Sequence, residues 1–141
     1  MSRLLIRERR ADAPGILIAF GDVMSRLPLE KVDGWLVKEL SAAGTQPFGL
    51  QMPHFEALSQ KLSNGVLLTP RELLELTAAD VEIYDGEFIG VSFQRFTSSS
   101  RVIEDGKVVT LICFDSSHWE CQSEDPEIIA AVERGFRNVS W

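Results

Sequence analysis

The chain has 141 residues, of which 45% are hydrophobic and 25% charged, and its net charge is −7. These values are typical of one globular domain and exclude a disordered, collagen-like or coiled-coil chain. The acidic balance argues against nucleic-acid binding, which needs basic groups facing phosphates. The longest apolar stretch without a charge, residues 13–21, is too short for a transmembrane helix, and we recognise no secretory signal.

The first 27 residues contain a basic segment followed by a helical pattern. Residues 1–10, which include the charged run 7–10, predict a short edge strand or a solvated arm. Asp12 is a suitable N-cap and Pro14 is tolerated in a first turn, so we expect a helix to begin there. The apolar residues at helical spacing are Ile16, Phe20, Val23, Met24 and Leu27. A strand over residues 15–20 is the alternative.

The next region also has helical periodicity. Four apolar residues predict a second helix that ends at Gly44: Leu29, Val32, Leu36 and Leu40. Two prolines and a glycine predict a loop over residues 45–53. A third helix is expected over residues 53–62, with three residues facing inward: Phe55, Leu58 and Leu62.

The fourth predicted helix has a defined start. Thr69 and Glu72 form the sequence pattern of a capping box, with Pro70 at the first helical position. In this motif each side chain accepts a hydrogen bond from the other residue's backbone N–H. We expect the inner face of the helix to be formed by Leu73, Leu76 and Thr77.

After residue 80 the pattern changes to the alternation of strands. Asp85-Gly86 and Asp105-Gly106 are typical of tight hairpin turns, so they predict two hairpins. The strands expected here are 81–84, 87–93, 101–104, 107–114 and 118–122. The strand 107–114 is apolar on both faces, which indicates a central, covered position.

Asp125-Pro126-Glu127 predicts the start of a last helix, with Ile129, Val132 and Phe136 facing inward. The fold class is therefore expected to be α+β: N-terminal helices packed on a C-terminal antiparallel meander of four to five strands, followed by one helix. The expected single domain covers residues 1–141, in three parts: a helix-rich region 11–80, antiparallel strands 81–123 and a helix 125–138.

The segment 113–121 carries most of the reactive side chains. With a two-residue loop at Ser116 and Ser117, Asp115 opposes His118 across a hairpin. Ser-Ser is a poor pair for such a turn, so a longer loop with a shifted register is the alternative. We interpret the segment as a structural turn rather than a catalytic group. A metal site would use Asp115, His118, Glu120 and Cys113, but the chain offers no second His/Cys cluster, so none is predicted. His54 is expected to be an exposed helix residue.

The two cysteines are too few for a disulfide framework. In the register just described, Cys113 and Cys121 point to opposite faces of the hairpin. We therefore predict two free thiols and a reducing, cytoplasmic environment.

The charge is unevenly distributed along the chain. Residues 1–70 carry 8 basic and 7 acidic side chains, whereas residues 71–141 carry 6 basic and 14 acidic ones, so the sums are +1 and −8. The excess either keeps the protein soluble or forms a docking face for a basic partner. The candidate binding residues of that acidic face are Glu82, Glu87, Glu104 and Glu120.

The sequence therefore favours a small acidic interaction protein, of the kind that neutralises a basic protein as an immunity protein or antitoxin does. One alternative is a small-molecule-binding protein or enzyme with a pocket between helices and sheet. Another is a self-associating structural subunit, which leaves a homo-oligomer open. We expect no catalytic residues, no cofactor, no metal, no nucleic acid and no membrane contact.

Overall fold

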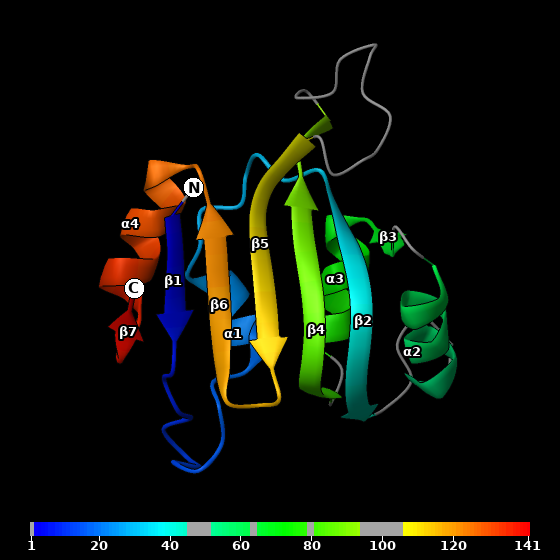
Figure 1. Ribbon diagram of the computed structural model, residues 1–141, viewed down its shortest axis with the longest axis horizontal. Helices are drawn as coiled ribbons and strands as arrows, with labels where there is room; N and C mark the ends of the chain where they lie inside the picture. The colour runs from blue at the N-terminus through cyan, green and yellow to red at the C-terminus, as the bar shows by residue number, and fades with distance from the viewer. Residues whose placement is uncertain (1, 45–51, 63–64, 79–80, 94–105) are drawn as a thin grey trace.

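The computed structural model describes residues 2–44, 52–62, 65–78, 81–93 and 106–141. The described part is built on one antiparallel sheet of seven strands in the order β3-β2-β4-β5-β6-β1-β7 (Figure 1). The strands are β1 (Ser2–Ile6), β2 (Gly34–Gly44), β3 (Val66–Leu68), β4 (Val81–Val91), β5 (Lys107–Phe114), β6 (His118–Ser123) and β7 (Val139–Ser140). The helices are α1 (Phe20–Ser25), α2 (Met52–Lys61), α3 (Pro70–Ala78) and α4 (Pro126–Gly135).

This architecture shows that the predicted fold class is wrong. The sheet is not a C-terminal meander of four to five strands, because β1, β2 and β3 come from the first half of the chain. The region 11–80 also contributes β2 and β3 to the sheet, beside three short helices. β1 is also not an edge strand: it pairs with β6 on one side and β7 on the other.

The predicted second helix is strand β2, and burial on both faces explains the error. Trp35 and Val37 pack in the core beneath the helices, while Leu36 is buried in a separate cluster with Ile89 and Val91. A strand buried on both faces has a continuous apolar run, which resembles a helical pattern once Leu40 is added four residues later. The aromatic and β-branched residues at 35 and 37 favoured the strand.

The predicted hairpin at Asp85-Gly86 is also wrong, because β4 runs through both residues. Asp85 pairs with Ser41 of β2, where the register shifts at a bulge. Gly86 does not have a positive φ; instead, an added Cβ would lie 3.0 Å from the Phe88 ring and 3.3 Å from Leu40 Cδ1. The glycine therefore permits a close approach of side chains rather than a turn.

Several other predictions are confirmed. β5 is the central strand of the sheet, and the helices predicted at 53–62, after Thr69 and at 125–138 correspond to α2, α3 and α4. The capping box of α3 is present, because the Thr69 N–H donates to Glu72 Oε1 at 2.9 Å and the Glu72 N–H donates to Thr69 Oγ1 at 3.1 Å. Asp125 caps α4 by accepting the Glu127 N–H at 2.9 Å.

The inward face predicted for α2 is wrong, because Leu58 and Leu62 are exposed and Ser59 is buried. Ser59 Oγ accepts a hydrogen bond from the Leu40 N–H, and Gln60 Nε2 donates to the Leu40 carbonyl oxygen, both at 3.0 Å. The bulge in β2 interrupts its pairing with β4 between Lys38 and Ser41. The helix turns its polar side inward because it satisfies these backbone groups.

The main core lies between the sheet and the helices on one of its faces. Figure 1 shows α1 and α3 behind the sheet, with α4 beside β1 and α2 beside β2. Phe20 of α1 stacks against Phe88 of β4 and Trp119 of β6, with ring centroids 4.2 and 5.2 Å apart. No described helix has the length and apolar character needed to cross a bilayer.

Candidate functional site

The segment between β1 and α1 supplies part of the lining of a cleft. It is a tight loop rather than the predicted helix, because the Arg10 N–H donates to the Ile16 carbonyl at 2.8 Å and the Ile18 N–H donates to the Glu8 carbonyl at 2.9 Å. Residues around Pro14 reverse the chain, so that Leu17 returns beside Arg9 in a β-bridge. Residues 15–19 therefore form neither the predicted helix nor the alternative strand, apart from the bridge at Leu17, and the helix is present only over α1, where Phe20 and Val23 are buried as predicted.

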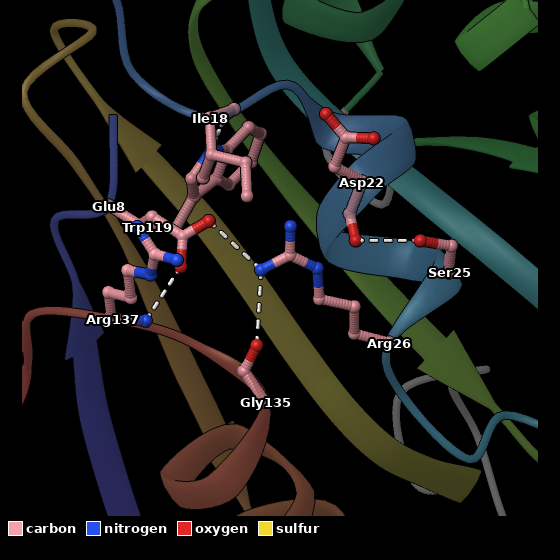
Figure 2. Close-up of polar contacts among 8 residues, drawn as sticks. All are labelled: Glu8, Ile18, Asp22, Ser25, Arg26, Trp119, Gly135 and Arg137. Carbon is pink, nitrogen blue, oxygen red and sulfur yellow. Dashed lines mark hydrogen bonds and ion pairs between the residues drawn. The ribbon is translucent and has the colours of Figure 1, made fainter. Parts of the chain in front are cut away.

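Trp119 fastens this loop to the sheet. Its indole N–H donates to the Ile18 carbonyl at 2.9 Å in a buried contact between residues 101 positions apart (Figure 2). A buried indole N–H needs such a partner, and the bond fixes the backbone where α1 begins. The hydrogen bond therefore holds the loop against the sheet, so the loop is not a solvated arm.

Glu8 and Arg26 join three elements at the end of the loop. Arg26 Nη1 lies 2.9 Å from Glu8 Oε2 and also donates to the Gly135 carbonyl at 3.1 Å, at the end of α4 (Figure 2). Glu8 Oε1 accepts the backbone N–H of Arg137 at 2.6 Å. The Arg26 guanidinium also lies 5.0 Å from the centroid of the Phe136 ring, within the range of a cation–π contact.

These contacts set the charge state of Glu8. Burial by itself raises the pKa of this carboxyl. The hydrogen bonds from the Arg137 N–H and the Arg26 side chain, together with their positive charges, outweigh burial and hold the pKa of Glu8 below its usual value. The Glu8–Arg26 pair therefore stays ionised down to mildly acidic pH.

Around this pair lies a cleft of about 730 Å³, which we call the arginine cleft. Its cationic lining residues are Arg9, Arg10, Arg26, Arg134 and Arg137. Its acidic lining residues are Glu8, Asp12 and Asp22. The cleft thus has an excess of positive charge, although the whole chain has a net charge of −7.

The arginines differ in how far they are already engaged. Arg9 donates to the carbonyl oxygens of Ser116 and Ser117 at 3.4 and 3.1 Å, and Arg26 uses Nη1 for Glu8 and Gly135. Within the described ranges, the side chains of three cleft arginines have no hydrogen bond or ion pair: Arg10, Arg134 and Arg137. These three, with the remaining N–H groups of Arg26, are the donors that the cleft offers.

The described residues of the predicted acidic face differ in their burial and in their contacts. Glu82 is exposed near the start of β4, and Glu87 is half-buried further along the same strand. Glu120 on β6 is only 7% exposed, lies 3.5 Å from Arg3 and accepts a hydrogen bond from Gln122. Glu104 lies outside the described residues. Glu87 and Glu120 both pair with Ile112 of β5, so these two share a sheet face.

The predicted register of the 113–121 hairpin is wrong by one residue. Its loop has three residues, with Asp115 and Ser116 at positive φ, so Phe114 pairs with His118 and stacks on its ring at 5.1 Å. Because side chains alternate, this slip moves Cys113 to the core face beside Trp119. The predicted Asp115–His118 cross-strand pair therefore does not form.

The hairpin geometry speaks against a catalytic serine. Ser117 Oγ donates to the Phe114 carbonyl at 2.7 Å, so its proton is already committed. His118 Nδ1 lies 2.8 Å from Ser117 Oγ. Because the hydroxyl proton of Ser117 is already donated to Phe114, the ring N–H of His118 is the donor in this contact. To act as a general base, His118 would instead have to accept the hydroxyl proton of Ser117.

The cysteines are free, as predicted, but the argument that led to this prediction is wrong. Cys113 and Cys121 lie on the same core face, in diagonal positions across β5 and β6, so the opposite-face argument is wrong. Burial raises the pKa of Cys113 to about 11 and that of Cys121 to about 12. Such buried thiols are inert at neutral pH.

No group of three metal-ligating side chains occurs among the described residues. The sequence interpretation missed the arginine cleft, because its cations come from residues 9–10, 26 and 134–137, which are distant in sequence. The run Arg9-Arg10 was the available signal, but the segment was interpreted as a solvated arm.

Comparisons with protein-family models, with curated proteins and with solved structures find no match to this chain.

Proposed function

We propose that this protein binds a small anionic molecule, such as a phosphate or polycarboxylate, in the arginine cleft. The observation that carries the proposal is the convergence of five arginines on one cleft of an otherwise acidic protein. Guanidinium groups present forked donors that match the geometry of carboxylates and phosphates.

Arg26 is the anchor of the proposed site. Glu8, the Gly135 carbonyl and the Phe136 ring hold its guanidinium in place, and its side chain keeps 37% of its exposure. A donor that is held before the ligand arrives loses less side-chain entropy on binding, so more of its interaction energy appears as affinity. Arg10, Arg134 and Arg137 supply the further charges.

The size and lining of the cleft support a polar ligand. Its volume of about 730 Å³ lies within the roughly 300–1,000 Å³ of small-molecule sites. Ligand pockets are usually lined mainly by apolar groups, whereas eight charged residues line this cleft. The anionic side chains Asp12 and Asp22 favour an anion that also carries a hydrogen-bond donor, such as the hydroxyl group of citrate or the protonated oxygen of hydrogen phosphate.

A titration with inorganic phosphate and with citrate, followed by amide NMR spectra at low ionic strength, tests the proposal. We expect saturable shifts at the residues of the cleft and loss of binding in the double variant Arg134→Gln/Arg137→Gln. The control Lys61→Gln/Arg71→Gln removes the same charge from exposed sites outside the cleft and should bind normally. Equal weakening in both double variants would show only nonspecific charge attraction and contradict the proposal.

A second candidate function is docking of a basic protein through the acidic residues of β4. Glu82 is exposed and Glu87 is partly so, which supports an electrostatic contact. Glu120 adds little to it, because its carboxylate is buried beside Arg3. Self-association stays a prediction without a contact that favours it.

A further inference from the structure

A second large cavity, about 720 Å³ in volume, lies between α4 and the chain that follows α1, and we call it the apolar groove. Arg26 and Arg134 line it, and both line the arginine cleft as well. The two cavities therefore adjoin at these two side chains. The apolar lining residues of the groove are Leu27, Pro28, Pro126, Ala130 and Ala131.

The walls of the groove offer few hydrogen-bonding groups. Pro28 and Pro126 have no backbone N–H, and alanine side chains carry no polar atom. Ala130 and Ala131 lie inside α4, where their backbone groups bond within the helix. A hydrocarbon chain needs no hydrogen bonds, so it suits these walls better than a peptide backbone does.

The two ends of the groove carry opposite charge. Arg134, in the last turn of α4, is exposed and makes no hydrogen bond or ion pair within the described ranges. Arg26 lies at the same end, because it donates to the Gly135 carbonyl, and its side chain is partly exposed. Glu127, in the first turn of α4, is exposed and lines the other end. An anionic group of a ligand is therefore attracted to the arginine end alone.

The helix α4 gives the length of the groove. Pro126 and Arg134 are separated by roughly 12 Å along the axis, at about 1.5 Å per residue. An extended chain advances about 1.2 Å per covalent bond, because a residue of three bonds spans about 3.6 Å. A linear chain of about eight to ten carbons therefore reaches from the arginines to Pro126.

We propose that the anion bound at the arginine cleft is a phosphate monoester with one linear hydrocarbon chain of about eight carbons. Its phosphate binds Arg134 and the remaining N–H groups of Arg26, and its chain lies along the apolar groove toward Pro126. This inference rests on the proposed function, since it uses the same arginines and adds the apolar part of the ligand.

Alkyl phosphates that differ only in chain length test the role of the groove. A fully buried methylene improves affinity about fourfold, so four extra methylenes that are about half covered should make octyl phosphate bind on the order of tenfold more tightly than butyl phosphate. In amide NMR spectra both compounds should shift residues of the arginine cleft, and only octyl phosphate should shift Glu127, at the far end of the groove.

The possible failures of this series are distinguishable. Equal affinities of octyl and butyl phosphate, with inorganic phosphate still bound, would overturn the hydrocarbon chain and leave the groove as a surface for contact with another protein. Absence of shifts with every phosphate compound would overturn the proposed function of the arginine cleft together with this inference.

A variant with a matched control locates the chain. Ala130→Gln places a longer polar side chain in the groove and should reduce the advantage of octyl over butyl phosphate from about tenfold to about twofold. Ala57→Gln, at an exposed residue of α2 outside both cavities, should keep the full advantage. Inorganic phosphate should bind to both variants as to wild type, which shows that both are folded. An unchanged advantage in Ala130→Gln would contradict the path of the chain.

The charge of Glu127 tests the orientation of the ligand. Octane-1,8-diyl bisphosphate places a second phosphate beside Glu127 and should bind about threefold more weakly than octyl phosphate. Glu127→Gln should reduce this difference, whereas Glu133→Gln, at an exposed residue of α4 outside both cavities, should keep it. Tighter binding of the bisphosphate than of octyl phosphate to wild type would overturn the orientation.

Discussion

The arginine cleft and the acidic residues of β4 and β6 use charge in different ways. In the cleft, Arg26 is held by Glu8 and Gly135, while three neighbouring arginine side chains make no hydrogen bond or ion pair within the described ranges. On the strands, Glu82 is exposed but Glu120 is buried beside Arg3. The number of charges along a segment thus does not show how many are available to a partner; their burial and neighbours do.

The largest effect is expected at Glu120, which is the most buried of the described residues of the predicted acidic face. Glu120→Lys places an unpaired cation in a site that is 7% exposed, next to Arg3. We expect a loss of about 3 kcal/mol in the free energy of unfolding, measured by urea denaturation. A change below about 0.5 kcal/mol would mean that Glu120 belongs to the solvated acidic surface after all.

The next effect concerns the pair that anchors the arginine cleft. Glu8→Gln should cost about 1–2 kcal/mol at neutral pH, a figure discounted because Arg26 is partly exposed. The folded-state pKa of Glu8 is lowered, so its contribution is present above the unfolded pKa and is lost as the pH falls through the folded pKa.

Urea denaturation of wild type and Glu8→Gln between pH 7 and pH 3 measures this pH dependence. The difference between the two proteins should shrink as the pH falls. A difference that grew in acid would contradict the lowered pKa of Glu8.

The capping box of α3 provides a reference away from both charged regions. Thr69→Ala removes the acceptor of the Glu72 N–H and should lower the free energy of unfolding by about 1 kcal/mol. Binding of phosphate and citrate should not change. If Thr69→Ala altered anion binding as much as a cleft variant does, binding would report stability rather than a site.

The smallest effect on stability is expected for charge reversal at three of the residues that the sequence predicts as an acidic face. The triple variant Glu82→Lys, Glu87→Lys and Glu104→Lys should cost no more than about 0.5 kcal/mol at each position. If these residues dock a basic protein, a pull-down at low and high salt should lose that protein in the variant, mainly through a slower association rate. Identical capture by wild type and variant at both salts would leave docking without support.

Local signals in the sequence were sufficient where the structure depends on neighbouring residues. The capping box at Thr69 and the Asp125 cap gave α3 and α4, and apolar residues on both faces gave the central strand β5. Where tertiary contacts decide, the same rules failed. Asp85-Gly86 is a hairpin signal, yet both residues lie within β4, at a place where an added Cβ at Gly86 would press on Phe88 and Leu40.

The candidate site was the least predictable part. Arg26 is the C-cap residue of α1, Arg134 lies in the last turn of α4 and Arg9 follows β1, so only the fold brings them together. Nothing in the spacing of these residues encodes a common cleft. By contrast, the one-residue slip at Ser116 arose from a close choice between loop lengths, since Ser-Ser is a poor pair for a two-residue turn.

The position of β1 has a consequence for how the protein folds. Ser2 pairs with Ser123 and Leu5 with Glu120, so the first strand completes its ladder only with the last quarter of the chain. Contacts at such sequence separations give a high contact order, which slows folding because a long loop must close first. During synthesis, β1 and the apolar groups of Leu4 and Ile6 must therefore wait, unpaired, until β6 has left the ribosome.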